Sequence, residues 1–121
     1  MQRGIIVGGE SNIAGAVKCL LVDVFEATWD IYTDVSDINN DDLNLAQIIV
    51  FNFLEEDDSL NKLLTALRYI PTSKLVVFGY VNERVFIKQL SEIGVQHYLP
   101  FNSSRLEVTQ VINQILGVKI S

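Results

Sequence analysis

The sequence of 121 residues predicts one α/β domain built on a parallel sheet of five strands. The first observation is the run Ile48-Ile-Val-Phe51, a continuous apolar stretch that suits a strand buried on both faces. The second is that such short apolar runs alternate along the chain with segments whose apolar residues repeat at helical spacing. The third is composition: 49% hydrophobic and 20% charged residues, in a length that suits a single core.

The other strands are predicted at residues 4–7, 31–35, 74–78 and 95–99. Strands that alternate with helices in a chain of this length require right-handed crossovers and helices on both faces of the sheet. The economical arrangement is the flavodoxin-like strand order 2-1-3-4-5, with the strand around Ile48 at its centre. In such sheets, ligands gather at the carboxyl ends of the central strands, which places a candidate site around Asn52.

Between these strands the sequence predicts helices with recognisable ends. The first begins near Ile13, after capping side chains at residues 10–12, and runs to residues 28–29. Residues 36–42 are turn-like and hold a short second helix or none. Pro71 stops a third helix, whose inward stripe is formed by Leu60, Leu63, Leu64 and Leu67.

The last two helices carry clearer end signals. One helix begins at residues 82–83 and ends at Gly94, and its inward face is expected to carry Phe86, Leu90 and Ile93. The other begins with a capping box of Ser104 and Glu107 and runs to Gly117. Its core stripe is Val108, Val111, Ile112 and Ile115.

Charge and composition exclude several classes of function. The net charge of −6 argues against direct nucleic-acid binding, which needs a basic footprint. No apolar run approaches the roughly 20 residues that span a bilayer, and no signal peptide precedes the first strand, so we expect a cytoplasmic domain. Cys19 lies in an apolar helical pattern and is expected to be a small core residue.

The charge is unevenly distributed along the chain. Residues 1–58 hold twelve acids against Arg3 and Lys18, a net −10, whereas residues 59–121 hold three acids against seven bases, a net +4. This pattern is typical of an ordinary solvated surface, and it also fits a molecule with two complementary faces. His97 is the single histidine and has no carboxylate at a motif spacing, so we expect neither an enzyme nor a cofactor.

Residues 94–106, Gly-Val-Gln-His-Tyr-Leu-Pro-Phe-Asn-Ser-Ser-Arg-Leu, resemble the closing segment of a response-regulator receiver domain. The spacing from Gly9 to Asn52 and the strand at 74–79 fit as well, so the resemblance covers essentially the whole chain. It implies a signalling domain of a two-component system or phosphorelay. In that family a central aspartate accepts a phosphoryl group with help from an acid pair, Mg²⁺, a hydroxyl residue and a lysine.

The sequence departs from the family at every one of these positions. The acid pair falls on Gly8 and Gly9, with Glu10 beside it; the aspartate falls on Asn52, and the hydroxyl residue on Gly79. The lysine before proline is missing, because Leu99 directly precedes Pro100. We therefore interpret the chain as a pseudo-receiver with a degenerate pocket, without a phosphorylation site or a metal site.

The expected function is regulation through protein–protein contacts that do not depend on phosphorylation, with a protein partner or a second copy. The domain would act alone or as the N-terminal part of a longer regulator. The candidate surface is Arg84, Val85, Lys88, His97, Tyr98 and Arg105, from the predicted fourth helix, fifth strand and fifth helix. The alternative is a regulatory domain that binds a small molecule or nucleotide at the Gly8-Gly9 turn.

Overall fold

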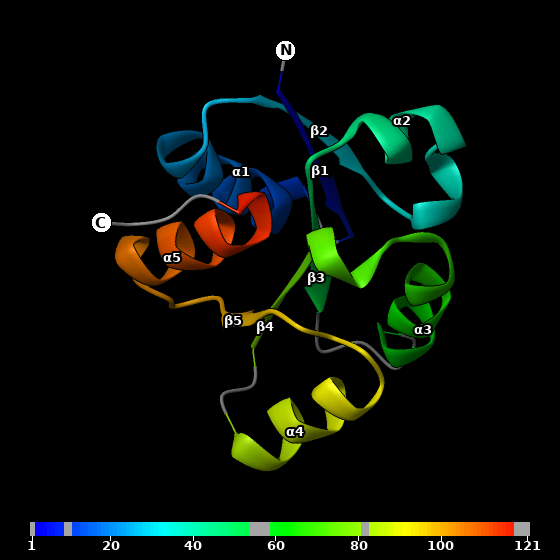
Figure 1. The fold of residues 1–121 in the computed structure, drawn as a ribbon, viewed down its shortest axis with the longest axis vertical. Coiled ribbons are helices and arrows are strands. Elements are labelled where there is room, and N and C mark those ends of the chain that lie inside the picture. The colour runs from blue at the N-terminus through cyan, green and yellow to red at the C-terminus, as the bar shows by residue number, and fades with distance from the viewer. Residues whose placement is uncertain (1, 9–10, 54–58, 81–82, 118–121) are drawn as a thin grey trace.

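A computed structural model describes residues 2–8, 11–53, 59–80 and 83–117, and it confirms the flavodoxin-like α/β fold with strand order β2-β1-β3-β4-β5 (Figure 1). All pairs of neighbouring strands are parallel. The strands are β1 (Arg3–Val7), β2 (Thr28–Tyr32), β3 (Ile48–Phe53), β4 (Leu75–Gly79) and β5 (Tyr98–Pro100). The helices are α1 (Ser11–Val24), α2 (Asn40–Leu45), α3 (Ser59–Tyr69), α4 (Arg84–Glu92) and α5 (Arg105–Leu116). Short 3₁₀ helices, η1 (Val35–Asp37) and η2 (Thr72–Lys74), precede α2 and β4.

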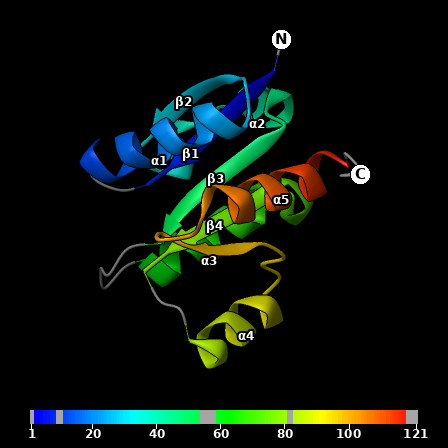
Figure 2. The same cartoon turned by 90° about the vertical axis from the view of Figure 1, so that its left-hand side faces the viewer.

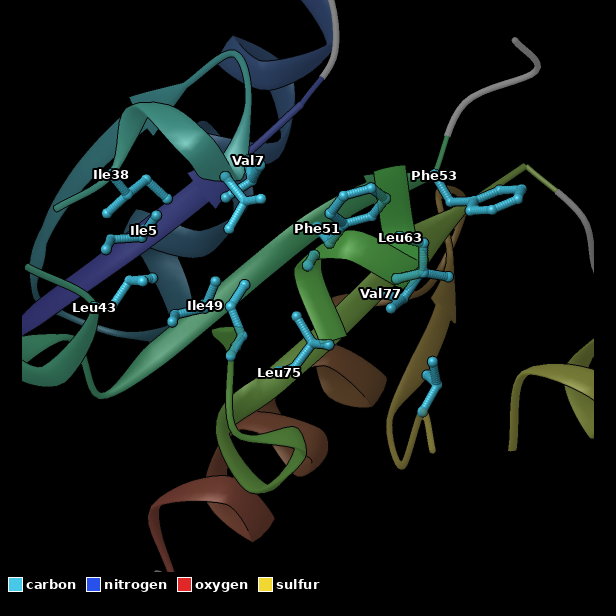
Figure 3. Close-up of a cluster of buried hydrophobic side chains, with 14 of the residues drawn as sticks. Ile5, Val7, Ile38, Leu43, Ile49, Phe51, Phe53, Leu63, Leu75 and Val77 are labelled. Atoms are coloured by element: carbon cyan, nitrogen blue, oxygen red, sulfur yellow. The ribbon is translucent and has the colours of Figure 1, made fainter. Parts of the chain in front are cut away.

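The central strand β3 is buried at every position, as its apolar run predicts. Its side chains alternate between two cores, because successive residues of a strand point to opposite faces. Ile49, Phe51 and Phe53 join the core beneath α2, α3 and α4 (Figure 3). Ile48 and Val50 join the core beneath α1 and α5. Figure 1 shows these helix sets on the two sides of the sheet, and Figure 2 shows α4 set apart at one end.

The predicted position of the second strand is wrong by three residues, since β2 spans Thr28–Tyr32 rather than 31–35. The first helix ends at Val24, four residues before the predicted end. Trp29 is the reason: it lies opposite Gly4 in the β1–β2 register, and it is 3% exposed. Burying this large ring sets where β2 begins, and Val35 is left to enter the core from η1.

The fifth strand is also shorter and later than predicted, at Tyr98–Pro100 rather than 95–99. Only the residues that pair with Val77, Phe78 and Gly79 of β4 form it. Val95 contributes to the core from the preceding loop instead. The fourth strand begins one residue late, because Lys74 belongs to η2.

Several predicted core residues lie at the surface. Cys19 is exposed on α1, so it is not a core residue. On α3, Leu60 and Leu64 are 50% and 40% exposed, because Leu63 and Ala66 take the inward positions, followed by Ile70 just after the helix. Ile93 directly follows α4 and is 41% exposed, because the helix has already ended there. The apolar face predicted from the sequence therefore includes too many residues on α3, and on α4 it extends past the end of the helix.

The ends marked by a capping box or by glycine are predicted correctly, unlike the end of α1. Ser104 and Glu107 form the capping box of α5, and Gly117 ends that helix in the left-handed conformation at φ 72°. Gly94 follows α4 with φ 109° and donates its N–H to the carbonyl of Ser91. Within the described part of the chain, no helix is long and apolar enough to cross a membrane.

The short helix α2 is held in place by two basic side chains, one from β1 and one from η2. Arg3 of β1 pairs with Asp42 of α2 at 3.2 Å and with Asp30 of β2 at 3.1 Å. Lys74 donates from Nζ to the carbonyl oxygens of Leu43 and Ala46, at 2.6 and 3.0 Å. Burial lowers the pKa of Lys74 from its ordinary value. These contacts satisfy carbonyls at the end of a six-residue helix that has little stability of its own.

Two glycine substitutions should change stability in opposite directions. A Cβ at Gly4 would lie 2.4 Å from the buried Trp29 ring, so Gly4→Ala should destabilise the fold by about 2 kcal/mol or more. Gly15 lies inside α1 with nothing within 4 Å of its Cβ position, so Gly15→Ala should stabilise by about 0.5–1 kcal/mol. Urea unfolding of both variants measures this. A Gly4→Ala variant as stable as wild type would contradict the packing of Trp29.

Candidate functional site

Asn52 is the one buried polar residue in the described part of the chain, at 3% exposure near the carboxyl end of β3. By strand alternation its side chain shares the α1 and α5 face with Val50. Its Nδ2 donates to the carbonyl of Gly8, 3.1 Å away, just beyond β1. Its Oδ1 is buried with no hydrogen-bond partner. The amide therefore links the carboxyl ends of β1 and β3 through one hydrogen bond. Its Oδ1 remains a hydrogen-bond acceptor without a donor.

Gly8 makes the turn after β1 in a conformation that only glycine adopts readily, with φ 89°. A Cβ there would lie 3.3 Å from the carbonyl oxygen of Asn52. Its N–H donates to the carbonyl of Tyr32 at 2.9 Å, and its own carbonyl accepts from Asn52. The polar groups of Gly8 are thus used within the protein. Gly9 and Glu10, the other predicted members of this turn, lie outside the described residues.

Gly79, at the end of β4, lies beneath the ring of Tyr98 from β5. A Cβ at residue 79 would stand 2.3 Å from the Tyr98 hydroxyl oxygen and 2.8 Å from Cε1. Any other side chain at this position would have to displace the tyrosine. The absence of a side chain at Gly79 therefore allows Tyr98 to lie inward, over the end of β4.

A row of aromatic rings continues from Tyr98 along this edge of the sheet. The Tyr98 ring meets Phe86 of α4 edge-to-face, with centroids 5.8 Å apart. Phe86 packs on Phe53 at 5.4 Å, and Phe53 stacks on Tyr80 at 6.3 Å. Contacts of this kind contribute about 0.5–1.5 kcal/mol each beyond their buried area. They attach α4 to the sheet through aromatic side chains.

The predicted interaction residues do not form one continuous face. Arg84, Val85 and Lys88 are exposed together on α4, and Val85 is 69% exposed. His97 and Tyr98 are half-buried, and Tyr98 turns toward Phe86. Burial also lowers the pKa of His97 from its ordinary value of 6.5, so its imidazole favours the neutral form.

Arg105 is directed away from this set. Its Nη2 donates to the carbonyl of Asp23, in the last turn of α1, at 3.2 Å. The arginine thereby satisfies one of the free carbonyls at the end of that helix. Of the six predicted residues, Arg84, Val85 and Lys88 are the ones that lie together, on the outward face of α4.

The residues around Asn52 do not fit the Mg²⁺ site that the receiver resemblance implies. Mg²⁺ prefers carboxylate oxygens in octahedral geometry, whereas Asn52 offers one amide oxygen and Gly8 has no side chain. Among residues 2–8, 11–53, 59–80 and 83–117, no three His, Cys, Asp or Glu side chains gather to hold a metal ion. The acidic run 55–58, a rival source of ligands, lies outside the described residues.

A cavity of about 330 Å³ lies on the α1 side of the sheet near this edge. Ile13, Val17 and Leu20 of α1 form one wall, and Phe78 and Phe101 form the other. Asn12 is its polar lining residue, and no Lys or Arg lines it. This lining suits a neutral apolar group and does not suit a phosphate.

Sequence reasoning missed two features of this region. Phe53 and Tyr80 were not singled out, although aromatic residues that flank the ends of neighbouring strands are a signal for such a row. The groove between η1 and α3, described below, was also missed, because its walls come from residues about thirty apart whose contact depends on helix packing.

Neither any family model nor any curated protein matches this sequence. Solved structures do match its fold. A pilus assembly-related protein from Burkholderia pseudomallei is 10% identical, with a TM-score of 0.73, over 99% of this chain and 93% of that one. The receiver domain of a DNA-binding response regulator from Colwellia psychrerythraea is 9% identical, with a TM-score of 0.72, over 97% and 99%.

A CheY-like receiver domain from Methanospirillum hungatei is 14% identical, with a TM-score of 0.70, and the match covers 97% of this chain and 94% of that one. Similarities at these identities establish the fold alone. The chain therefore has the five-stranded flavodoxin-like fold that response-regulator receiver domains also have.

Replacing Asn52 by aspartate should destabilise the protein in a pH-dependent way. At about pH 7 the carboxylate would be buried against the Gly8 carbonyl, which should cost about 2 kcal/mol. Burial raises the pKa of the new carboxyl above its ordinary value of about 3.9, so the native state binds more protons than the unfolded state. The deficit relative to wild type should therefore shrink as the pH falls toward about 5.

Urea unfolding of Asn52→Asp and wild type at both pH values measures this change. Asn52→Leu is the matched control, since it also removes the donor to Gly8 but introduces no titrating group. Its deficit should be the same at both pH values. An Asn52→Asp deficit that does not vary with pH would contradict the buried placement.

Proposed function

We propose that this chain is a regulatory domain of the receiver type that signals through protein–protein contacts without being phosphorylated. The observation that carries this proposal is the amide of Asn52 at the carboxyl end of the central strand, bonded to Gly8. An amide cannot act as the carboxylate nucleophile of phosphoryl transfer. A signalling role is supported by the fold, since two of the similar solved structures are named as receiver domains.

The packing of Tyr98 supports a surface that stays in one state. In receivers, a hydroxyl residue in the position of Gly79 moves with the phosphoryl group and repositions the aromatic residue of the fifth strand. Here that position has no side chain, and the Tyr98 ring already lies over it, packed on Phe86. With no group to move the ring, α4 should keep the same placement whether or not a phosphoryl donor is present.

The outward face of α4 is the proposed contact surface. Val85 is 69% exposed between the bases Arg84 and Lys88. The side chains that hold α4 to the sheet, Phe86 and Leu90, lie on the opposite side of the helix. An exposed apolar residue flanked by cations suits an acidic protein surface, from another protein or from a second copy. We propose no catalytic role, cofactor or direct nucleic-acid contact for this chain.

The alternative of an anion or nucleotide at the Gly8-Gly9 turn has less support. The Gly8 N–H is bonded to Tyr32, and the cavity beside Asn12 is lined by apolar side chains. Phosphate binding at a helix N-terminus needs free N–H groups that point at the ligand. We therefore retain protein–protein contact as the proposed function.

Incubation with acetyl phosphate and Mg²⁺ should leave the intact mass unchanged, because no carboxylate occupies the Asn52 position. Mass spectrometry under mild acid conditions, which preserve acyl phosphates, measures this. A receiver domain with an intact aspartate pocket, treated in parallel, should gain the mass of one phosphoryl group. A phosphoryl adduct near Asn52 would overturn the proposal.

Self-association, or association with an acidic partner, should depend on α4 and not on phosphoryl mimics. The double variant Arg84→Glu, Val85→Glu should weaken self-association measured by light scattering at low salt. The matched control is Lys18→Glu, Val22→Glu on α1, which makes the same change in charge and also replaces an exposed valine. Beryllofluoride should have no effect on wild type. Equal association of the α4 variant and wild type, or a shift caused by the mimic, would contradict this assignment.

A further inference from the structure

A groove runs between η1 and α3 on the side of the sheet that carries α2. Two adjoining cavities of about 320 and 260 Å³ form it, and Ser36 and Thr65 line both. Val35, Ile38 and Leu43 line the larger cavity and are no more than 6% exposed, so they give it an apolar floor.

The rim of this groove is acidic. Asp34 lines the smaller cavity, and Asp37 is exposed in the same short segment. Asp41 is exposed on α2 beside Asn40, which lines the larger cavity. Residues 34–42 contain four acids and no base, and of these four only Asp42 is paired with Arg3. On the α3 wall Lys62 is the one basic residue among the lining.

The first two turns of the outward face of α4 have the opposite character, and the exposed acid Glu92 follows on the same face in the last turn. Its first two turns present Val85, 69% exposed, between the cations Arg84 and Lys88. A branched apolar side chain flanked by two bases complements an apolar floor flanked by acids. Asn40 and Leu43 of α2 line the groove, and Figure 1 shows α2 and α4 at opposite ends of the molecule, so one copy cannot bring its own α4 onto its groove.

We propose that the η1–α3 groove is the docking site for α4 of a second copy of this chain. The inference rests on the proposed function, because it names the partner of the α4 face. Val85 inserts over the floor of Val35 and Ile38, while Arg84 and Lys88 face the acidic rim. Each copy then uses one groove and one α4, which is a head-to-tail contact and not a two-fold symmetric one. Since one helix face buries a modest area, the association is weak and sensitive to salt.

A head-to-tail contact can be tested by mixing two defective variants. Arg84→Glu, Val85→Glu removes the inserting helix face and leaves the groove intact. Thr65→Arg fills the groove at the residue that lines both cavities and adds a cation there. It lies at an exposed position of α3, where arginine is a better helix former than threonine, so the fold is retained. Each variant alone should self-associate at least about tenfold more weakly than wild type.

The equimolar mixture should form a dimer of one copy of each variant, because the α4 of Thr65→Arg can enter the groove of the other. Growth stops there, whereas wild type should add further copies as its concentration rises. Sedimentation velocity at low salt, with one variant labelled by a fluorophore, measures this. The Lys18→Glu, Val22→Glu variant should self-associate like wild type, because it keeps both the groove and the outward face of α4.

The outcomes separate this inference from the proposed function. If wild type associates through α4 but the mixture stays monomeric, the groove assignment is wrong while the α4 surface stands. If the α4 variant associates like wild type, the proposed surface itself fails, and the groove proposal fails with it. A monomeric wild type at all concentrations would also overturn the second-copy partner.

Discussion

Burial of β3 on both faces is the constraint on which the rest of this structure depends. All six residues of Ile48–Phe53 are buried, so the strand needs a helical layer on each side. That requirement positions α1 and α5 on one face and α2, α3 and α4 on the other. It also places Asn52 near the carboxyl end of the central strand, with its side chain inside the protein. A polar residue in that place has to bond to a neighbouring strand end, and Gly8 provides the acceptor.

At the carboxyl ends of the central strands, Gly8, Asn52 and Gly79 bring small residues and one amide, and none of the three is charged. Gly8 closes the turn after β1, and Gly79 leaves room for the ring of Tyr98. The space is filled by packing: Tyr98, Phe86, Phe53 and Tyr80 form a continuous row. These rings thereby attach α4 to the sheet.

Electrostatics distinguishes the surface around η1 and α2 from the outward face of α4. The acids of η1 and α2 are only partly neutralised, since Arg3 pairs with Asp42 and Asp30 but with none of the exposed acids. Lys74 is occupied with the carbonyls at the end of α2, where burial lowers its pKa. Among the contacts of the described residues, Arg84 and Lys88 of α4 make no comparable hydrogen bond or ion pair within the protein. The groove therefore has acids at its rim and an apolar floor, whereas the outward face of α4 carries Arg84, Lys88, Glu92 and one exposed valine.

The sequence alone determined the fold class, the strand order, the central strand and the helix ends at Gly94, Ser104 and Gly117, because apolar periodicity and capping are local signals. It also determined that Gly8, Asn52 and Gly79 bring no carboxylate or hydroxyl group to the carboxyl ends of the central strands, since these residues are read directly from the chain. The tertiary structure decided where β2 and β5 begin, because Trp29 is buried against Gly4 and β5 exists only where β4 pairs with it. It alone decided that Cys19 and Leu60 are exposed, that Tyr98 lies over Gly79, and that Ser36 and Thr65 share a groove. Those outcomes depend on contacts between residues far apart in the chain, which no local pattern encodes.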